Sequence, residues 1–404
     1  MATKPKTPLG RGKSLDEALA RIAKDRDLSI GSLSEHNIDV EAISTGNIAI
    51  DHITGVSGLP KGRLVELFGP PSSGKTTCAL QVAAHAQQQG DTVLYLDYEH
   101  AMDPEYCSTL GLDVNAPTFL FAQPETFEQG MNAMRELIET GEIAVVIVDS
   151  VASMVIEKEL SIETGGSTFA DKAKLMAQAM RQLTGVVQRY NVCVIFLNHI
   201  QQVIDTSPIG QKLASQGIKR SKTPGGDALK FHASVRMEFK PVGNIRGEQV
   251  NELTNEKEDI VEQTKVQVTC VKNKVGPPFR SCVVRVRFGK GFSQAQAVLD
   301  VLTAYKVVKK KTGTGGKATG AYELPAADSE DVVTLRGESN VVSAIEQDAH
   351  WLAVLTTLAH EQLDSGEVTK DAGTADELVD DAFEEDEGGA VGLLDAAFEG
   401  GGAV

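Results

Sequence analysis

A glycine-rich segment at residues 69–76 carries the clearest chemical signal in the chain. It reads GPPSSGKT, which fits the phosphate-binding pattern G-x-x-x-x-G-K-[ST]. The pattern predicts a loop whose backbone N–H groups surround phosphate oxygens at the start of a helix, where the helix dipole favours negative charge. Lys75 should then contact the β- and γ-phosphates, and Thr76 should hold Mg²⁺. The alternative is a plain glycine-rich turn. The residues expected to bind nucleotide here are Gly69, Ser72, Ser73, Gly74, Lys75, Thr76 and Thr77.

Two carboxylates could complete a site for phosphoryl transfer. Asp149 ends an apolar run, and an acid at the carboxyl end of a buried parallel strand faces the ligand crevice. We expect it to contact Mg²⁺ through water, although it could instead cap the next helix. Glu99 follows the apolar run 92–97. It could act as a general base if its strand neighbours the strand of the phosphate loop; otherwise it is a surface carboxylate.

Alternating apolar runs and amphipathic segments predict the elements that would position these groups. Four runs are typical of strands buried on both faces, and they lie at 63–69, 92–97, 144–150 and 192–198. Helical patterns lie between them, at 75–89, 126–140 and 171–189. This alternation predicts an α/β fold with a mostly parallel sheet and right-handed crossovers. Three later runs should extend the sheet, near 233–240, 265–272 and 282–288.

The chain is expected to divide into four parts. They are residues 1–38 (helix and polar linker), 39–295 (α/β core), 296–365 (a smaller α/β domain) and 366–404 (a disordered acidic tail). The helix at 14–26 begins with a capping box of Ser14 and Glu17. Because an isolated helix of this length is marginal in water, we expect it to dock on the core or on another copy. Trp351 should lie in the core of the smaller domain.

Composition excludes several classes of protein. No run of 18 apolar residues occurs, so no transmembrane helix or membrane partner is expected. The first residues are basic but lack the apolar segment of a secretory signal. The five cysteines form no C-x-x-C pair, which predicts reduced, buried thiols and not disulfides or a zinc site. Together these features indicate a cytoplasmic protein.

The net charge of −17 is distributed unevenly along the chain. Residues 371–404 hold eleven acidic and no basic residues, so the first 370 residues carry only −6. A phosphate-backbone partner is therefore excluded for the tail but not for the rest of the chain. The tail also contains a near-repeat, at 379–384 and 394–399, with a phenylalanine in each copy. These copies could be docking motifs for the chain's own basic surfaces or for a replication partner, or they could result from low-complexity drift.

Several strings in a fixed order resemble the RecA family of bacterial DNA strand-exchange recombinases. They are AISTG (42–46), GLPKGR (58–63), the phosphate loop, DYEHA (97–101), VDSVA (148–152), QAMR (178–181), GGDALKF (225–231) and VKNK (271–274). The resemblance covers residues 14–365 and is strongest between 42 and 290. It implies a RecA-type P-loop ATPase core that uses ATP and Mg²⁺. It also implies an N-terminal helix that packs on the adjacent protomer of a helical filament.

The resemblance implies roles for individual residues of the nucleotide site. Glu99 matches the catalytic glutamate of the family, and Asp103 and Tyr106 match the positions that hold the adenine. Lys272 and Lys274 match a pair of cations that reaches the ATP of the neighbouring subunit. Cations there would stabilise charge that develops on the γ-phosphate, so hydrolysis would depend on assembly.

DNA is implied to bind in two loops, at 159–170 and 201–225, and on the helix after the first loop. The residues expected to contact it are Phe169, Lys174, Arg181, Ile204, Lys212, Lys219, Arg220, Lys222, Gly225 and Gly226. In this family the C-terminal domain captures duplex DNA, and a lysine cluster would do so here. The cluster includes Lys309, Lys310 and Lys311. The alternative for these lysines is a solvated hairpin.

Three positions depart from the family pattern. His199 stands where the family has a glutamine that senses the γ-phosphate, Pro71 replaces a glutamate, and Asp227 replaces an asparagine that contacts DNA. Because histidine changes charge near neutrality, we expect activation to become pH-sensitive. We expect phosphate binding to survive Pro71, whereas the DNA contact at Asp227 is open. Such departures are reminiscent of phage-encoded recombinases.

The function implied is that of an ATP- and DNA-dependent recombinase. It would form filaments on single-stranded DNA, pair and exchange homologous strands in recombination and repair, and stimulate repressor self-cleavage. Two alternatives stay open, a hexameric RecA-fold helicase or motor and an ATP-gated DNA scaffold that exchanges nothing. Single-strand-binding or mediator proteins are expected partners of the acidic tail.

Removing residues 371–404 should increase the affinity for duplex DNA at low salt. The tail carries most of the excess negative charge, so its removal ends its competition with the DNA backbone for the basic surfaces. Titrating a fluorescent duplex with the full and truncated chains measures the effect. Equal affinities at low salt would contradict a tail that restrains duplex binding.

Overall fold

The computed structural model describes residues 17, 18, 21, 40–160, 169–202, 221–250, 257–312, 318–329 and 331–365. From Glu41 onward the described residues belong to one compact unit. Several predictions lie outside the described residues: most of the helix at 14–26, the first loop from 161 to 168, the acidic tail, and Ile204, Lys212, Lys219 and Arg220. Within the described ranges, no helix is both long and apolar enough to cross a membrane.

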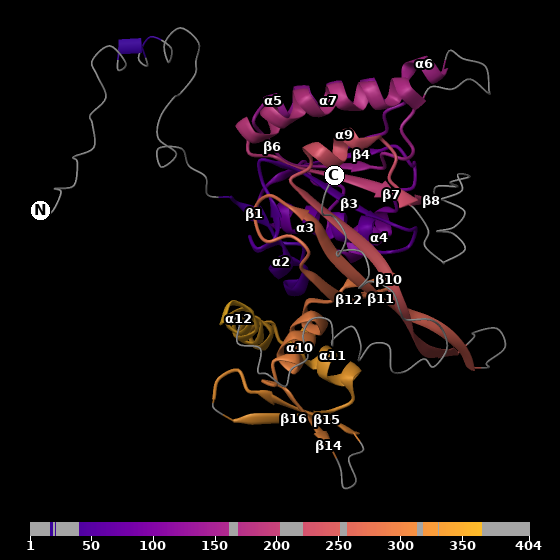
Figure 1. Cartoon of the computed structure of the whole chain (residues 1–404). Helices are drawn as coiled ribbons and strands as arrows, with labels where there is room; N and C mark the ends of the chain where they lie inside the picture. The colour runs from indigo at the N-terminus through magenta and orange to yellow at the C-terminus, as the bar shows by residue number, and fades with distance from the viewer. Residues whose placement is uncertain are drawn as a thin grey trace, which may run out of the picture. The chain divides into compact units, whose positions relative to one another are not determined.

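Nine strands of the described chain form one sheet, in the order β13-β12-β11-β10-β3-β7-β6-β4-β5 (Figure 1). The six strands from β10 to β5 in this order run parallel, and β10 to β13 pair antiparallel. This confirms the predicted α/β fold with a mostly parallel sheet. The strands are β3 (Arg63–Gly69), β4 (Thr92–Asp97), β5 (Phe119–Ala122), β6 (Ile143–Asp149), β7 (Cys193–His199), β10 (Val235–Val250), β11 (Lys257–Asn273), β12 (Ser281–Arg287) and β13 (Gly291–Phe292).

Helices cover both faces of the sheet because alternate strand residues point to opposite sides. In β6, Val145 and Ile147 join one core cluster, whereas Val146 and Val148 join another. The first cluster includes side chains of α2 (Ile48–Thr54), α3 (Lys75–Gln88) and α4 (Pro104–Thr109). The second includes side chains of α5 (Phe127–Glu139), α7 (Phe169–Arg189) and α9 (Asp227–His232). Continuous apolar strands are thus explained by burial on both sides.

The β10–β11 hairpin is much longer than the predicted strands at 233–240 and 265–272. Only Val235–Glu238 of β10 pairs with β3, and the hairpin continues beyond the sheet (Figure 1). A register shift falls between Pro241 and Gly243, where a proline can be accommodated in a strand. Most of the side chains that are described in the far half are exposed or half-buried, so they show no alternating apolar pattern and periodicity did not predict it.

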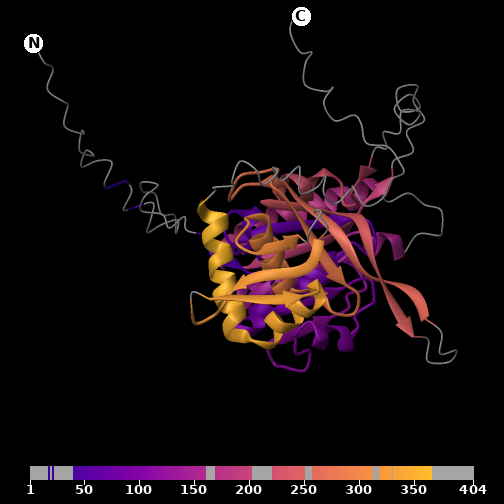
Figure 2. The ribbon, with the colours of Figure 1, turned by 90° about the horizontal axis from the view of Figure 1, so that it is seen from below.

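A second, three-stranded antiparallel sheet lies in the C-terminal part, which Figure 2 shows from below. It consists of β14 (Lys309–Thr312), β15 (Ala318–Pro325) and β16 (Val332–Arg336), with helices α10 (Gln294–Ala304), α11 (Glu338–Gln347) and α12 (Ala349–Ser365). Side chains of β15, β16 and the three helices pack in one core cluster, which Val308 joins just before β14. Trp351 is buried in it and its Nε1 donates to the Pro325 carbonyl at 2.8 Å, as expected of a core residue. The boundary predicted between residues 295 and 296 falls inside α10.

Several short elements lie outside these two sheets. The strands β1 (Ala42–Ile43) and β2 (Leu59–Pro60) pair antiparallel, and α6 (Glu157–Leu160) includes the first two residues of the first predicted DNA loop. The strands β8 (Gln201–Gln202) and β9 (Ser221–Lys222) also pair antiparallel. They hold together the two ends of the second predicted DNA loop.

Candidate nucleotide site and DNA-facing surface

The phosphate loop joins β3 to α3, as the sequence predicted. A Cβ atom at Gly69 would collide with the main-chain oxygen of Phe239 on β10. Gly74, which caps α3, has a φ of 87°, in the left-handed region that favours glycine. Both glycines are therefore required by local geometry. They let the chain turn directly from a buried strand into a helix whose N-terminus favours anions.

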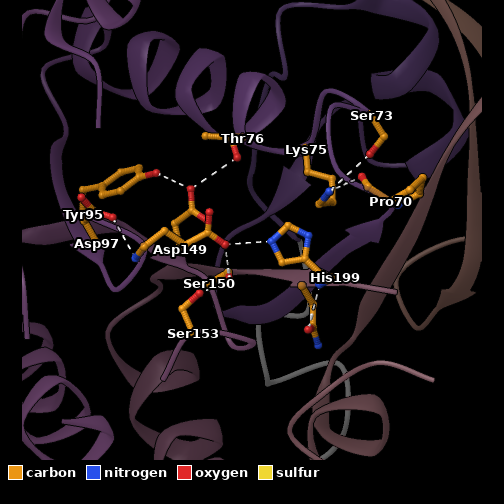
Figure 3. Close-up of polar contacts among 12 residues, drawn as sticks. Pro70, Ser73, Lys75, Thr76, Tyr95, Asp97, Asp149, Ser150, Ser153 and His199 are labelled. Atoms are coloured by element: carbon orange, nitrogen blue, oxygen red, sulfur yellow. Dashed lines mark hydrogen bonds and ion pairs between the residues drawn. The ribbon is translucent and has the colours of Figure 1, made fainter. Parts of the chain in front are cut away.

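Lys75 lies within this loop and is 5% exposed. Its Nζ donates to the Pro70 carbonyl at 2.7 Å and to Ser73 Oγ at 3.4 Å (Figure 3). Burial lowers the pKa of the Lys75 ammonium to about 8, and the negative charges of Asp149 and Glu99 act in the opposite direction. The cation is therefore held among the groups that would surround phosphates, and additional negative charge would stabilise it.

Asp149 ends β6 beside the first turn of α3. Its Oδ2 accepts hydrogen bonds from the Tyr95 hydroxyl at 2.7 Å and from Thr76 Oγ1 at 3.3 Å (Figure 3). Burial raises the pKa of Asp149 to about 6, and the hydrogen bonds from Tyr95 and Thr76 counteract part of this rise. A hydroxyl and a carboxylate in contact are the oxygen donors that Mg²⁺ prefers, so the pair expected from the sequence fits this cation.

Glu99 reaches the site by a route that the sequence did not predict. Its strand, β4, does not neighbour β3, because β6 and β7 lie between them; the expected reason for its proximity was wrong. Glu99 Oε1 instead accepts from Ser150 Oγ at 2.5 Å and lies 2.8 Å from His199 Nε2. His199 ends β7, which does neighbour β3, so this contact connects Glu99 to the phosphate-loop strand.

Hydrogen bonding favours the ionised form of Glu99. Burial alone would raise the pKa of this carboxyl, but the hydrogen bonds from Ser150 and His199, with the charge of Lys75, outweigh burial and hold it below its usual range. The other ring nitrogen of His199, Nδ1, is buried and has no hydrogen-bond partner among the described residues. A buried polar atom without a partner is costly, and while Nε2 donates to Glu99 this nitrogen is available to a ligand group that donates a hydrogen bond.

The two residues expected at the adenine lie at α4, close to the start of α3. Asp103 caps α4, and its Oδ1 accepts from the main-chain N–H of Glu105 at 2.9 Å and of Tyr106 at 3.2 Å. The Tyr106 hydroxyl is 2.8 Å from Thr77 Oγ1. Thr77 was expected to bind nucleotide, yet its hydroxyl contacts Tyr106. The contact places Tyr106 one residue away from the residue that would hold the metal.

Lys272 and Lys274 lie at the end of β11, apart from the groups above. Lys272 Nζ donates to the carbonyls of Lys230 at 2.6 Å and Phe231 at 2.8 Å, and Lys274 Nζ to that of Phe231 at 3.4 Å. Among the residues that the structure describes, no hydrogen bond or ion pair joins either lysine to Glu99 or Asp149. Both cations instead cap the last turn of α9, where the helix dipole favours positive charge.

The predicted DNA-binding residues that the structure describes lie on two surfaces. On α7, which begins at Phe169, Lys174 and Arg181 are exposed. Lys222 in β9 pairs with Gln201 at the ends of the second loop. The loop ends at Gly225, and Gly225 and Gly226 have φ values of 88° and 71°.

The lysine cluster of the smaller domain lies on β14 and is exposed. Lys311 pairs with Glu323 at 2.7 Å, and Lys310 Nζ lies 5.5 Å from the ring centroid of Tyr322. Lys309 is paired in register with Glu323 across the β14–β15 ladder. The three lysines therefore lie together on one edge strand, but the negative charge of Glu323 compensates part of their positive charge.

Sequence reasoning missed several polar residues around the site. Tyr95 and Ser150, which donate hydrogen bonds to the two carboxylates, were not selected, although Tyr95 lies in the apolar run 92–97 and Ser150 in the string VDSVA (148–152). Glu66, Asn198 and Arg236 form a buried polar cluster beside His199. A charged residue inside the apolar run 63–69 was the signal that could have revealed this cluster.

Comparison with known proteins places these features in one family. The family model described as the RecA N-terminal domain matches residues 13–293. Protein RecA from Rickettsia prowazekii is 36% identical over 355 residues, which cover 84% of this chain and 98% of the relative. Protein RecA from Rickettsia canadensis is 40% identical over 301 residues, covering 74% and 81%. A crystal structure of the RadB recombinase matches at 20% identity with a TM-score of 0.43, over 62% of this chain and 97% of that one.

The substitution Tyr95→Phe should make Mg²⁺-dependent ATP hydrolysis more sensitive to acid. The Tyr95 hydrogen bond lowers the pKa of Asp149, so its loss should raise that pKa further above about 6. Less of the carboxylate is then ionised at pH 6.5. The Mg²⁺ concentration for half-maximal hydrolysis should increase at pH 6.5 and approach the wild-type value at pH 8.5.

Tyr98→Phe is the matched control, because the Tyr98 hydroxyl is buried and has no hydrogen-bond partner among the described residues. It should leave the Mg²⁺ requirement unchanged at both pH values. A Tyr95→Phe enzyme that needs the same Mg²⁺ concentration at both pH values would show that Tyr95 does not tune a metal-binding carboxylate.

Proposed function

Because this chain belongs to the RecA family and is an ATP-dependent DNA recombinase for strand exchange and repair, we propose that it hydrolyses ATP at the phosphate loop. The observation that carries this proposal is that Thr76, in the first turn of α3, contacts Asp149 at the end of β6, while Glu99, just beyond β4, accepts a hydrogen bond from Ser150, the residue after Asp149. Lys75 would bind the β- and γ-phosphates. Mg²⁺ would be held by Thr76 directly and by Asp149 through water, and it would neutralise phosphate charge.

Glu99 is the proposed general base for the attacking water. It would accept a proton from that water as the water oxygen bonds to the γ-phosphorus and the bond to the β-phosphate oxygen breaks. Its lowered pKa keeps it ionised at neutral pH, and Ser150 and His199 fix its orientation.

DNA binding and self-association are the remaining parts of the proposal. Single-stranded DNA would lie along the two loops and α7, where Lys174 and Arg181 are exposed. In a filament, Lys272 and Lys274 would face the ATP of a neighbouring copy. The exposed lysines of β14 would capture duplex DNA, and the acidic tail would recruit single-strand-binding or mediator proteins.

A strand-exchange assay with Glu99→Gln tests the proposed function. The wild-type chain should exchange strands between homologous DNA molecules only with ATP, and single-stranded DNA should stimulate its ATPase. Glu99→Gln should keep ATP-dependent DNA binding but lose ATP hydrolysis by about 100-fold or more, the usual contribution of a general base. Phosphate release and DNA capture are measured on the same preparation.

Glu105→Gln is the control for this experiment, because Glu105 is an exposed acid near the site whose side chain has no proposed role. Closed rings that unwind a forked duplex would point to a hexameric motor instead. A scaffold would be indicated if the wild-type chain exchanged no strands and Glu99→Gln kept full biological activity. Unchanged hydrolysis in Glu99→Gln would remove this residue from the mechanism.

The contact of His199 with Glu99 should make hydrolysis depend on pH. Histidine side chains ordinarily change charge between about pH 5 and 8. A protonated His199 would form an ion pair with Glu99 at the 2.8 Å contact and would weaken it as a base. DNA-stimulated ATP hydrolysis should therefore fall as the pH is lowered from 8 to 6, and His199→Gln should reduce this fall.

His350→Gln serves as the control, because His350 pairs with Asp328 in the smaller domain. It should retain the wild-type pH profile. A profile that is flat between pH 6 and 8 and identical in His199→Gln would contradict a pH-sensitive contact.

A further inference from the structure

A buried carboxylate, Glu66, lies on the central strand β3 beside the nucleotide site. It is fully buried in a strand whose other residues from Leu64 to Phe68 are apolar. Burying a carboxylate costs free energy unless it is paired and hydrogen-bonded. Neither phosphate binding nor the proposed hydrolysis uses this group, so its presence needs a separate explanation.

The two strands that flank β3 supply the partners of Glu66. Its Oε1 accepts from Asn198 Nδ2 at 2.9 Å, and its Oε2 accepts from Arg236 Nε at 2.5 Å. β3 lies between β7, which carries Asn198, and β10, which carries Arg236 directly opposite Glu66 in register. The Arg236 guanidinium also lies 4.5 Å from the centroid of the Phe68 ring. The cluster is thus held by the pairing of the sheet itself.

Asn198 uses its remaining hydrogen-bonding capacity on two functional segments. Its Oδ1 accepts from the His199 main-chain N–H at 3.0 Å. Its Nδ2 donates a second hydrogen bond, to the Pro224 carbonyl at 3.1 Å. Pro224 follows β9, where the chain returns from the second predicted DNA loop. One amide group therefore contacts both the residue that holds Glu99 and the end of a DNA-binding loop.

We infer that Glu66 is a positioning residue that couples the second DNA loop to the catalytic glutamate. An amide side chain can present either its oxygen or its nitrogen, and the Glu66 carboxylate accepts only from the nitrogen. Glu66 thereby turns Nδ2 of Asn198 toward Pro224 and leaves Oδ1 for His199. A displacement of the loop end by bound DNA reaches the His199 main chain through this amide, and the His199 ring contacts Glu99.

This inference rests on the proposed function, because it assumes that DNA stimulates hydrolysis at Glu99. Its test uses the direction of the hydrogen bonds. Asn198→Asp keeps the acceptor for the His199 N–H but removes both bonds donated by Nδ2, and it brings two carboxylates together. Adding Glu66→Gln exchanges amide and carboxylate. The hydrogen bond between the two side chains can then form again and the bond from Arg236 is kept, but no donor faces the Pro224 carbonyl.

The two variants separate positioning from stability. Asn198→Asp should lower the melting temperature of the full chain, and the double variant, Asn198→Asp with Glu66→Gln, should recover most of it. The ratio of ATPase rates with and without single-stranded DNA should fall about tenfold in Asn198→Asp and stay low in the double variant. The KM for ATP should change less than about twofold in the double variant, because no phosphate contact is altered.

Each outcome decides the inference. Recovery of DNA stimulation together with the melting temperature in the double variant would show that the cluster only stabilises the fold. Wild-type stimulation in folded Asn198→Asp would also overturn the coupling. A wild-type chain whose ATPase is not stimulated by single-stranded DNA would contradict the proposed function itself, which is a different result.

Discussion

Parallel strand pairing is the constraint on which the site depends. Because all parallel strands end at the same edge of the sheet, their last residues meet there whatever their separation in sequence. The register makes this specific: Gly69 lies opposite His199, and Asp97 lies opposite Asp149. The phosphate loop, the proposed metal carboxylate and the histidine are thus neighbours before any side-chain contact is formed. Glu99 lies two residues beyond Asp97 and is therefore at the same edge of the sheet.

Two acids in this small space acquire opposite pKa shifts, which separates their chemistry. Burial dominates at Asp149 and raises its pKa to about 6, so this group gains from a nearby cation. Hydrogen bonds dominate at Glu99 and lower its pKa, so it stays ionised without a metal. The difference follows from exposure and partners, since Asp149 is buried and Glu99 is only part-buried beside two polar side chains. One carboxylate suits a cation and the other suits a water molecule.

Much of the fold and part of the site followed from the sequence, for physical reasons. The phosphate loop and Asp149 are local features, a turn and a strand end, whose geometry depends on adjacent residues. The sequence identified Glu99 as a candidate base but did not explain how it reaches the site. Strand order is a property of the whole sheet, and β4 does not neighbour β3 as the sequence suggested. Most of the described side chains in the far half of the β10–β11 hairpin are exposed or half-buried, so the sequence shows no alternating pattern there. Glu66 was hidden inside an apolar run because its partners, Asn198 and Arg236, are distant in sequence.

The second loop is attached to the protein at points that also hold the catalytic groups. Its first end follows His199, which contacts Glu99, and its last end at Pro224 contacts Asn198. A Cβ atom at Gly225 would lie 2.9 Å from Val151, so this end also packs against the segment after Asp149. From there α9 begins at once, and the carbonyls of its last turn bind the two lysines at the end of β11. A loop anchored in this way cannot move at one end without affecting either the base or the helix that orients those lysines. The attachment of the loop therefore supplies a physical route for the proposed coupling between DNA and nucleotide.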